Sequence, residues 1–183
     1  LPAEHHEVQL LTTNFQFTGQ LETVGDITTY INDSIRQSLS LHDAYLTPLT
    51  PGSPVRGLNR PHIVVLRPQT VFLYFTSAET RASIRKMSKR ELLVAYTPIA
   101  VCRGYFHMTA ESRLRDFTDV IQEPLIPVSE ARVLPLIEFP APFPPGCSPL
   151  SPGQGRVGKA RPWLPPLASE DEREVFEEKT IAR

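Results

Sequence analysis

Histidines and carboxylates are the residues best suited to chemistry in this chain, and they are scattered along it. His5, His6 and Glu7 form the one short run that looks like a metal-binding pair. Adjacent side chains of an extended segment point to opposite sides, so the two histidines would not share an ion without a turn. We therefore interpret this run as a polar, solvent-exposed lead-in.

The other three histidines do not form a metal-binding pattern either. His42, His62 and His107 have no cysteine, aspartate or second histidine at the spacing of metal ligands. We expect each of them to be structural or to lie on the surface, because a lone histidine is most often one or the other. The sequence thus predicts neither a metal ion nor a cofactor.

Two aspartates could in principle form an acid–base pair. Asp116 and Asp119 are three residues apart on a predicted helix, which makes them neighbours. Arg113 and Arg115 lie beside them, so a solvated, charge-balanced helix face is the favoured interpretation.

Cysteine chemistry is also not indicated. Cys102 falls in a predicted strand, where a small buried thiol is inert, and Cys147 falls in a proline-rich segment without a neighbouring base. No nucleophile elbow and no phosphate-binding glycine loop is present in the sequence. We therefore predict no catalytic residue and a protein that is not an enzyme.

The most basic stretch runs through Ser77–Arg90, which we predict to be a connecting helix. Its cations are the candidate contacts for a partner or a nucleic acid: Arg81, Arg85, Lys86, Lys89 and Arg90. A net charge of −1 and the lack of interleaved aromatic residues argue against a dedicated nucleic-acid binder. The alternative is an exposed inter-domain helix, or one neutralised by the acidic stretch Glu170–Glu178.

The elements that would position these residues occur twice. Residues 17–49 align with residues 102–136, at an offset of 85 before residues 24–25 and of 87 after them. Each copy predicts two strands, a short helix and a further strand with an interruption at Asp43-Ala44 or Glu130-Ala131. The aligned positions predict an equivalent core in each copy: Gly19, Ile27, Tyr30, Leu41, Ala44 and Leu46 in the first, and Gly104, Leu114, Phe117, Val128, Ala131 and Val133 in the second.

Turns and helix starts are predicted at specific residues. Thr12-Thr13-Asn14 and Thr97-Pro98 are expected to separate the first two strands of each copy. The two glycines, Gly19 and Gly104, are expected to mark a bulge or a sharp coil of the sheet, and the two interruptions a bulge or a short turn. The short helices are expected over Asp26–Ile35 and Ser112–Gln122, with Asp26 and Ser112 as N-caps.

A further β-rich pair follows the first copy. His62–Arg67 and Val71–Phe75 are separated by Pro68-Gln69-Thr70, which predicts a β-hairpin. Both runs are nearly continuous in apolar residues, so we expect both faces of the hairpin to be covered. The hairpin either completes the first unit or pairs with the second copy and joins the two units into one sheet.

The predicted fold is mainly β with short helices, an α+β protein of two tandem small rolled sheets or open barrels. Each unit is roughly β-β-α-β-β-β, and the second lacks its last hairpin, because residues 124–166 hold 12 of the 19 prolines. The expected organisation is a first β-rich repeat (1–76), a basic connecting helix (77–91), a second repeat (92–139) and a proline-rich segment with an acidic tail (140–183).

The second copy resembles a bacterial family of small β-rich domains of unknown function. The resemblance rests on a strand with a glycine, Arg103–His107, then Arg-Leu-x-Asp within Arg113–Phe117, then a strand ending in Ala-x-Val within Leu125–Val133. The first copy resembles the pattern in part, through Gly19, Asp26-Ile27 and Asp43–Leu46. The likeness spans residues 8–75 and 93–136. It implies two tandem copies and brings no known catalytic residues.

These observations together predict a non-catalytic interaction, scaffold or regulatory protein, with a protein as partner. Because the second unit lacks a hairpin, we expect an open sheet edge that permits self-association. The alternatives are a nucleic-acid-binding small-barrel protein and an enzyme with an unrecognised site. Low cysteine use and short apolar runs lead us to expect a cytoplasmic protein without a membrane partner.

Overall fold

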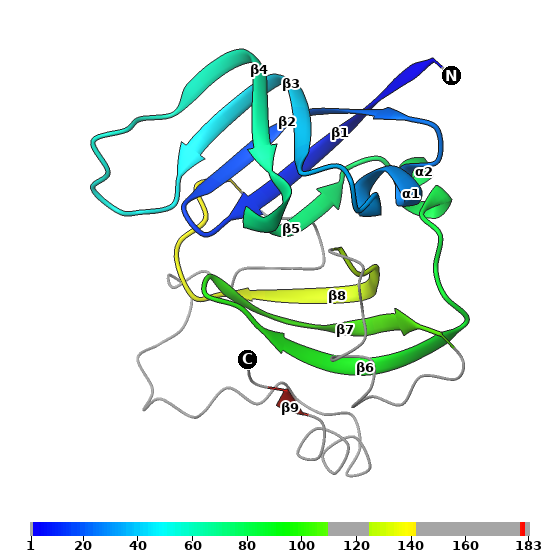
Figure 1. Cartoon of the computed structure of the whole chain (residues 1–183). Coiled ribbons are helices and arrows are strands. Elements are labelled where there is room, and N and C mark those ends of the chain that lie inside the picture. The colour runs from blue at the N-terminus through cyan, green and yellow to red at the C-terminus, as the bar shows by residue number, and fades with distance from the viewer. Residues whose placement is uncertain (1, 110–124, 142–179, 182–183) are drawn as a thin grey trace, which may run out of the picture.

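A computed structural model shows a mainly β protein of two stacked sheets with two short helices (Figure 1). It describes residues 2–109, 125–141 and 180–181. The first sheet has five antiparallel strands in the order β4-β3-β2-β1-β5 and the second has the order β8-β7-β6-β9. The α+β fold class predicted from the sequence is confirmed, with open, rolled sheets rather than closed barrels.

The elements have the following bounds. The first sheet comprises β1 (Ala3–Thr12), β2 (Phe15–Val24), β3 (Ser38–Pro48), β4 (Leu58–Leu66) and β5 (Thr70–Phe75). The second comprises β6 (Lys89–Tyr96), β7 (Ala100–Met108), β8 (Val128–Pro135) and the short parallel strand β9 (Thr180–Ile181). The helices are α1 (Ile27–Asn32), α2 (Ala78–Ser83) and the 3-10 turn η1 (Arg67–Gln69).

The predicted hairpin of the two β-rich runs is wrong. The strands β4 and β5 are consecutive in the chain, yet β4 pairs with β3 and β5 pairs with β1, at opposite edges of the sheet. The sheet rolls, so Val65 of β4 and Phe75 of β5 reach the same core from its two edges. A separate hairpin would have left these side chains without that shared interior. Because both strands belong to the first sheet, they also do not join the two sheets into one.

The core of the rolled sheet is closed at one end by α1. Its centre consists of fully buried leucines, Leu10, Leu21, Leu39 and Leu41. Three apolar residues at helical spacing on α1 face this core, namely Ile27, Tyr30 and Ile31. The helix begins after Asp26, whose carboxylate accepts a hydrogen bond from the Thr29 amide at 2.8 Å, as the sequence predicts, and it ends at Asn32, earlier than expected.

A β-bulge faces a glycine in each sheet. The β2–β3 register shifts at Gly19, opposite Asp43-Ala44, and the β7–β8 register shifts at Gly104, opposite Glu130-Ala131. Asp43 and Glu130 have φ values of 46° and 52°. A Cβ on Gly19 would lie 2.9 Å from the His42 carbonyl oxygen, and one on Gly104 would lie 2.6 Å from a Val128 methyl carbon. Of the two alternatives expected at the interruptions, a bulge or a short turn, the structure has the bulge in both sheets.

The first turns of the two sheets are also built alike. The Phe15 amide donates to Thr12 Oγ1 at 3.0 Å, and the Ala100 amide donates to Thr97 Oγ1 at 3.0 Å. Each threonine hydroxyl donates in turn to the carbonyl oxygen of the same partner residue. Both predicted turns are present, and a threonine side chain closes each of them.

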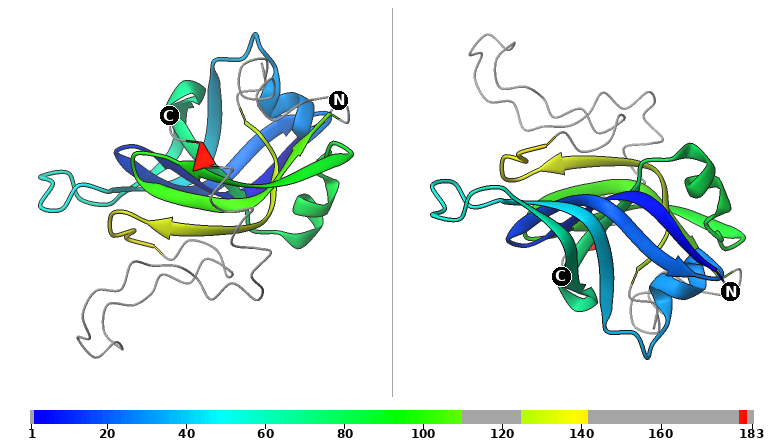
Figure 2. Two further views of the ribbon diagram at one scale, coloured as in Figure 1. Left: turned by 90° about the horizontal axis from the view of Figure 1, so that it is seen from below. Right: turned by 90° about the horizontal axis from the view of Figure 1, so that it is seen from above.

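The second sheet packs on the outer face of the first. Figure 2, from below and from above, shows the strands of one sheet lying over those of the other. The layer between them contains Leu11 and Leu49 from the first sheet side and Ile99, Cys102 and Val133 from the second. Leu10 and Leu11 are both fully buried because β1 has a core on each of its faces.

The predicted connecting helix Ser77–Arg90 is wrong in extent. The helix α2 begins after Ser77 and ends at Ser83, and Lys89 and Arg90 already belong to β6. The pairing of β6 with β7 starts at Lys89 opposite Met108. Ladder hydrogen bonds with β7 therefore override the helical spacing of this basic stretch.

Candidate functional site

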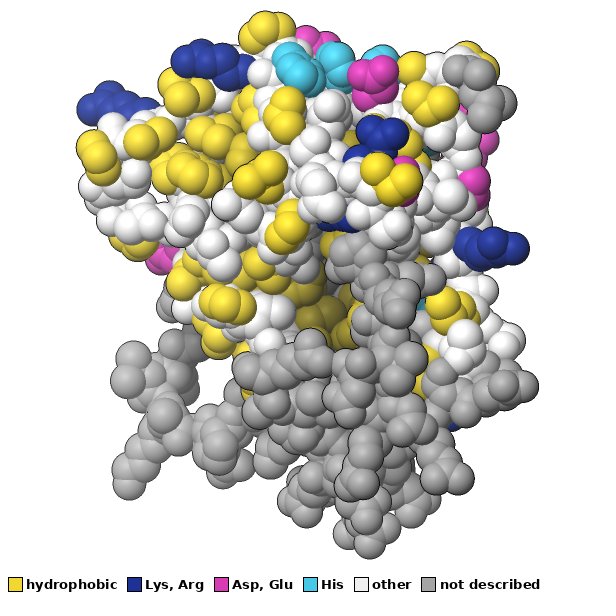
Figure 3. Space-filling model, viewed as in Figure 1, with side chains coloured by type: hydrophobic (Ala, Val, Ile, Leu, Met, Phe, Trp, Pro, Cys, Tyr) yellow, Lys and Arg dark blue, Asp and Glu magenta, His cyan; other side chains and the backbone are white. Residues whose placement is uncertain are grey.

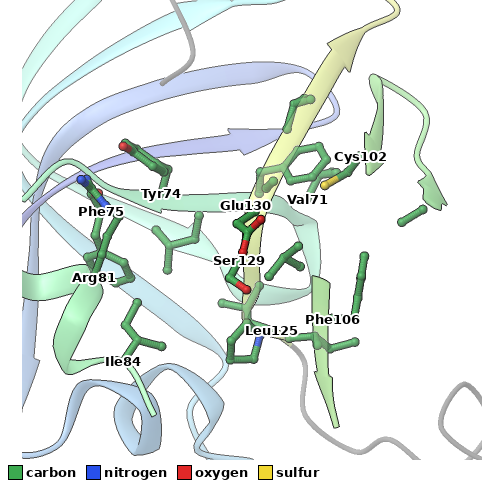
Figure 4. Close-up of a pocket in the computed structure, with 18 of the residues that line it drawn as sticks. Val71, Tyr74, Phe75, Arg81, Ile84, Cys102, Phe106, Leu125, Ser129 and Glu130 are labelled. Carbon is green, nitrogen blue, oxygen red and sulfur yellow. The ribbon is translucent and has the colours of Figure 1, made fainter. Parts of the chain in front are cut away.

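A cavity of about 780 Å³ lies between the two sheets. Its walls come from β5, β7, β8 and the segment after α2, and they are mostly apolar (Figure 4). Val71 and Phe72 contribute from β5, Cys102 and Phe106 from β7, and Leu125 from the segment before β8. This volume is in the range of small-molecule sites, and such walls suit an apolar group.

The polar residues at this cavity serve the fold. The guanidinium of Arg81 donates to the Phe75 carbonyl oxygen at 2.7 Å and lies over the Tyr74 ring at 5.2 Å, so it fastens α2 to the end of β5. Ser129 is hydrogen-bonded at 2.8 Å to the buried ring of His107. Glu130 is the one carboxylate among the described lining residues, and it pairs with Arg90 at 3.5 Å. These contacts do not assemble an acid, a base and a nucleophile.

The five basic residues singled out in the sequence do not share a helix face. Arg81 is held internally, and Lys86 lines the cavity. The backbone amide of Arg85 donates to the Thr28 hydroxyl at 2.9 Å. Lys89 lies 3.5 Å from Glu91, and Arg90 lies over the Tyr105 ring at 4.7 Å. The structure distributes them over a helix, a loop and a strand.

The predicted core residues of the two copies belong to different cores of the structure. Ile27, Tyr30, Leu41 and Ala44 are buried in the core of the rolled sheet, and Leu46 packs against it. Val133 is buried in the inter-sheet layer, against which Val128 and Ala131 pack. Leu114 and Phe117 lie outside the described residues, as do the predicted second helix Ser112–Gln122, the pair Asp116 and Asp119, and Cys147.

The strand β4 is the most exposed apolar element of the first sheet. Val64 is 54% exposed and Leu66 is 52% exposed, and Leu58 and Tyr45 are also exposed nearby. Figure 3 shows apolar side chains gathered on this part of the surface, over β3 and β4. The expectation that both faces of the His62–Arg67 run are covered is wrong, because one face is solvent-exposed.

A row of histidines crosses the outer face of the same sheet. His5 on β1, His42 on β3 and His62 on β4 lie beside one another, with Glu22 of β2 between the first two. Histidine side chains gather beside acidic ones at the top of Figure 3. Sequence reasoning missed this row because the residues are 17 to 57 positions apart, and only strand pairing makes them neighbours.

The other two histidines have structural partners. The ring of His6 bonds Thr23 Oγ1 at 3.0 Å on the inner side of the sheet. The ring of His107 bonds Ser129 on one side and lies 3.3 Å from the Met87 carbonyl oxygen on the other. These contacts agree with the expectation that His107 is structural. His5 and His6 lie on opposite faces of β1, as expected for adjacent residues of a strand.

Over the described residues, the helices are too short and too polar to cross a bilayer. Comparison with protein-family models, with curated proteins and with solved structures finds no match to the chain. The resemblance to a bacterial family of small β-rich domains therefore remains a prediction from the sequence.

Proposed function

We propose that this chain is a non-catalytic interaction protein that associates with a second copy of itself through the edge of β4. The observation that supports this proposal is the exposure of β4. It is a nine-residue strand at the sheet edge, and its outer face presents exposed apolar side chains, Val64 and Leu66. Long edge strands of this kind act as templates for a further strand.

The backbone of β4 is suited to strand addition. Within the described residues, β4 lies at the edge of the first sheet: β3 pairs with one side of it, and no strand pairs with the other side. Pro61 lacks an N–H group, so this position offers no donor to a further strand, and pairing would involve the part of β4 after it. The Arg67 amide donates to the Gln37 carbonyl oxygen at 2.9 Å, and the ladder continues in the same register along β4. Because peptide groups alternate along a strand, Val65 faces β3, and Val64 and Leu66 direct their N–H and C=O groups to the open side. A partner strand would pair with these groups.

A second copy is the occupant that the surface chemistry favours. Two β4 strands in antiparallel pairing are related by a two-fold axis, so the same apolar patch from each copy covers the other. The net charge of −1 gives little repulsion between copies. The second half of β4 presents the exposed apolar side chains Val64 and Leu66, whereas the residues typical of a protected edge, Arg60 and Pro61, lie in its first half.

The proposal is tested by light scattering of the full chain over a wide concentration range. We expect a dimer for the native sequence and a monomer for Val64→Lys, because a charge at the pairing face prevents association. The matched control is Ile35→Lys, which places the same charge at an 87% exposed isoleucine outside the sheet and should leave the dimer intact. Both variants are surface changes, expected to alter stability by less than about 0.5 kcal/mol.

Hydrogen exchange locates the contact. Peptides covering 58–66 should be protected at high concentration and lose that protection in Val64→Lys. A chain that stays monomeric at every concentration contradicts the proposal, and so does a dimer that survives Val64→Lys with β4 unprotected. If β4 instead binds a different protein, the chain alone would stay monomeric, and peptides 58–66 would be protected from hydrogen exchange only when that protein is added. This outcome also contradicts self-pairing.

The nucleic-acid alternative has less support. It depended on a basic helix over Ser77–Arg90, but the helix ends at Ser83 and the cations lie on different elements. Arg81 is bound to backbone carbonyl oxygens, and Arg90 forms a surface pair with Glu130. The enzyme alternative depended on converging polar groups in a cavity, and the described cavity walls are mostly apolar.

A further inference from the structure

Four metal-ligating side chains lie on adjacent strands of the first sheet. In the ladders His5 is opposite Glu22, and His42 is opposite His62. All four point to the outer face, because their neighbours Leu21, Leu41 and Ile63 face the core. Between β2 and β3 the ladder places His42 opposite Gln20, so Glu22 is a diagonal neighbour of His42 on the same face. Pairing of the strands β1, β2, β3 and β4 thus brings three imidazoles and one carboxylate near one another on this face.

His42 is the centre of this row. Its Nε2 lies 2.7 Å from Glu22 Oε2. Its ring centre is 5.3 Å from that of His5 and 5.0 Å from that of His62. Two imidazoles that share one ion, with metal–nitrogen bonds of about 2.1 Å, have ring centres at about this separation. The spacing within the row is thus compatible with a common ion.

We propose that His5, Glu22 and His42 bind a divalent transition-metal ion of the zinc type, with His62 in reach as a fourth ligand. Two histidines and one glutamate are an established ligand set for zinc, and imidazole also suits copper and nickel. Among the described residues no group of three or more such side chains could hold a metal ion in the arrangement that the structure has, so the proposal requires these side chains to change rotamer. The change is confined to side-chain torsions, because the strands hold the four Cα atoms in place.

The side chains of this row are exposed enough to change rotamer and close on an ion. His42 and Glu22 have side chains that are 35% and 36% exposed, and His5 and His62 are exposed. Exposed side chains change rotamer on a picosecond to nanosecond timescale. The nearest cation on β4, Arg60, donates to the Asn59 carbonyl oxygen at 2.8 Å and does not pair with Glu22. The Glu22 carboxylate contacts His42, a member of the same row, and an ion would take the place of that contact.

The test is titration of the full chain with cobalt(II), whose visible absorption reports nitrogen and oxygen ligation, followed by displacement with zinc(II). We expect one ion per chain, bound saturably. His42→Gln and Glu22→Gln should each weaken binding by about tenfold or more, by loss of a ligand. Nuclear magnetic resonance of the histidine rings should show His5 and His42 shifted by zinc, with His6 and His107 unchanged.

Asp43→Asn is the matched control. It removes a carboxylate next to His42, tolerates the positive φ at that position and leaves the row intact, so binding should not change. Thermal unfolding without metal checks that each variant folds. Binding that is unsaturable, or that persists undiminished in both His42→Gln and Glu22→Gln, overturns the proposal. This outcome is independent of whether β4 pairs with a second copy.

Discussion

At the scale of single residues, local side-chain hydrogen bonds decide where elements begin and turn. Asp26 accepts from the Thr29 amide and from the Thr29 hydroxyl, at 2.8 Å and 2.7 Å. These hydrogen bonds stabilise the ionised carboxylate and hold the pKa of Asp26 below its usual value. Such caps are readable from a sequence because the donor and acceptor lie within one turn.

Replacing Asp26 should lower the free energy of unfolding by an amount that depends on pH. Asp26→Ala should lower the free energy of unfolding by about 1 kcal/mol at neutral pH. Because the pKa of Asp26 is lower in the folded state, the carboxylate contributes stability above its unfolded pKa, and the contribution is lost as pH falls through the folded pKa. Urea unfolding at neutral and acidic pH should therefore show a difference that shrinks in acid. Asp26→Ser keeps a capping oxygen and should lose less at neutral pH, and an Asp26→Ala effect independent of pH would contradict this role.

At the scale of elements, a buried arginine links the turn η1 to the helix α1. Arg67 is 6% exposed, and its guanidinium donates to the carbonyl oxygens of Ile31 and Asp33 at the end of α1. The last carbonyls of a helix lack intrahelical partners, and a cation there satisfies them. Arg67 thus holds the helix over the core at the point where the chain crosses from β4 to β5.

Removing this link should loosen α1. Arg67→Ala is expected to lower the free energy of unfolding by about 1.5–3 kcal/mol, because charge-assisted hydrogen bonds to buried carbonyls are lost. Urea denaturation gives the value, and amide exchange of residues 27–32 should accelerate. The exposed Arg60→Ala is the control and should stay within about 0.5 kcal/mol of the native chain. Equal effects of the two substitutions would refute the linking role.

At the scale of the whole molecule, β1 connects two cores. Val8 and Leu10 face the rolled interior, and Leu11 faces the layer shared with the second sheet. A second tie is the side-chain amide of Gln16, which exchanges two hydrogen bonds with the backbone of Ala141, at 3.1 Å and 3.0 Å. The two sheets are therefore expected to unfold together.

Leu11→Ala tests this coupling. It should cost about 2–5 kcal/mol, as truncations of fully buried leucines do, and Leu10→Ala in the other core should cost a similar amount. Circular dichroism and hydrogen exchange of both sheets should report one coincident transition in each variant. Separate transitions for the two sheets, with Leu11→Ala affecting only the second, would show that they are independent.

The sequence alone determined the features that depend on neighbouring residues and on alternation. The cap at Asp26, the turns at Thr12 and Thr97, and the bulges opposite Gly19 and Gly104 were predictable, because their causes lie within a few residues or in an aligned pair of segments. The mainly β class followed from the same period-two patterns.

Only the tertiary structure decided which strands became neighbours. The runs Leu58–Leu66 and Thr70–Phe75 read as a hairpin, but the rolled sheet separates them to opposite edges, since burial of Val65 and Phe75 in one core outweighs local pairing. The same strand order exposes β4 and aligns His5, His42 and His62 across it. Contacts between residues so distant in the chain carry no local sequence signal, so the candidate sites emerged only from the folded sheet.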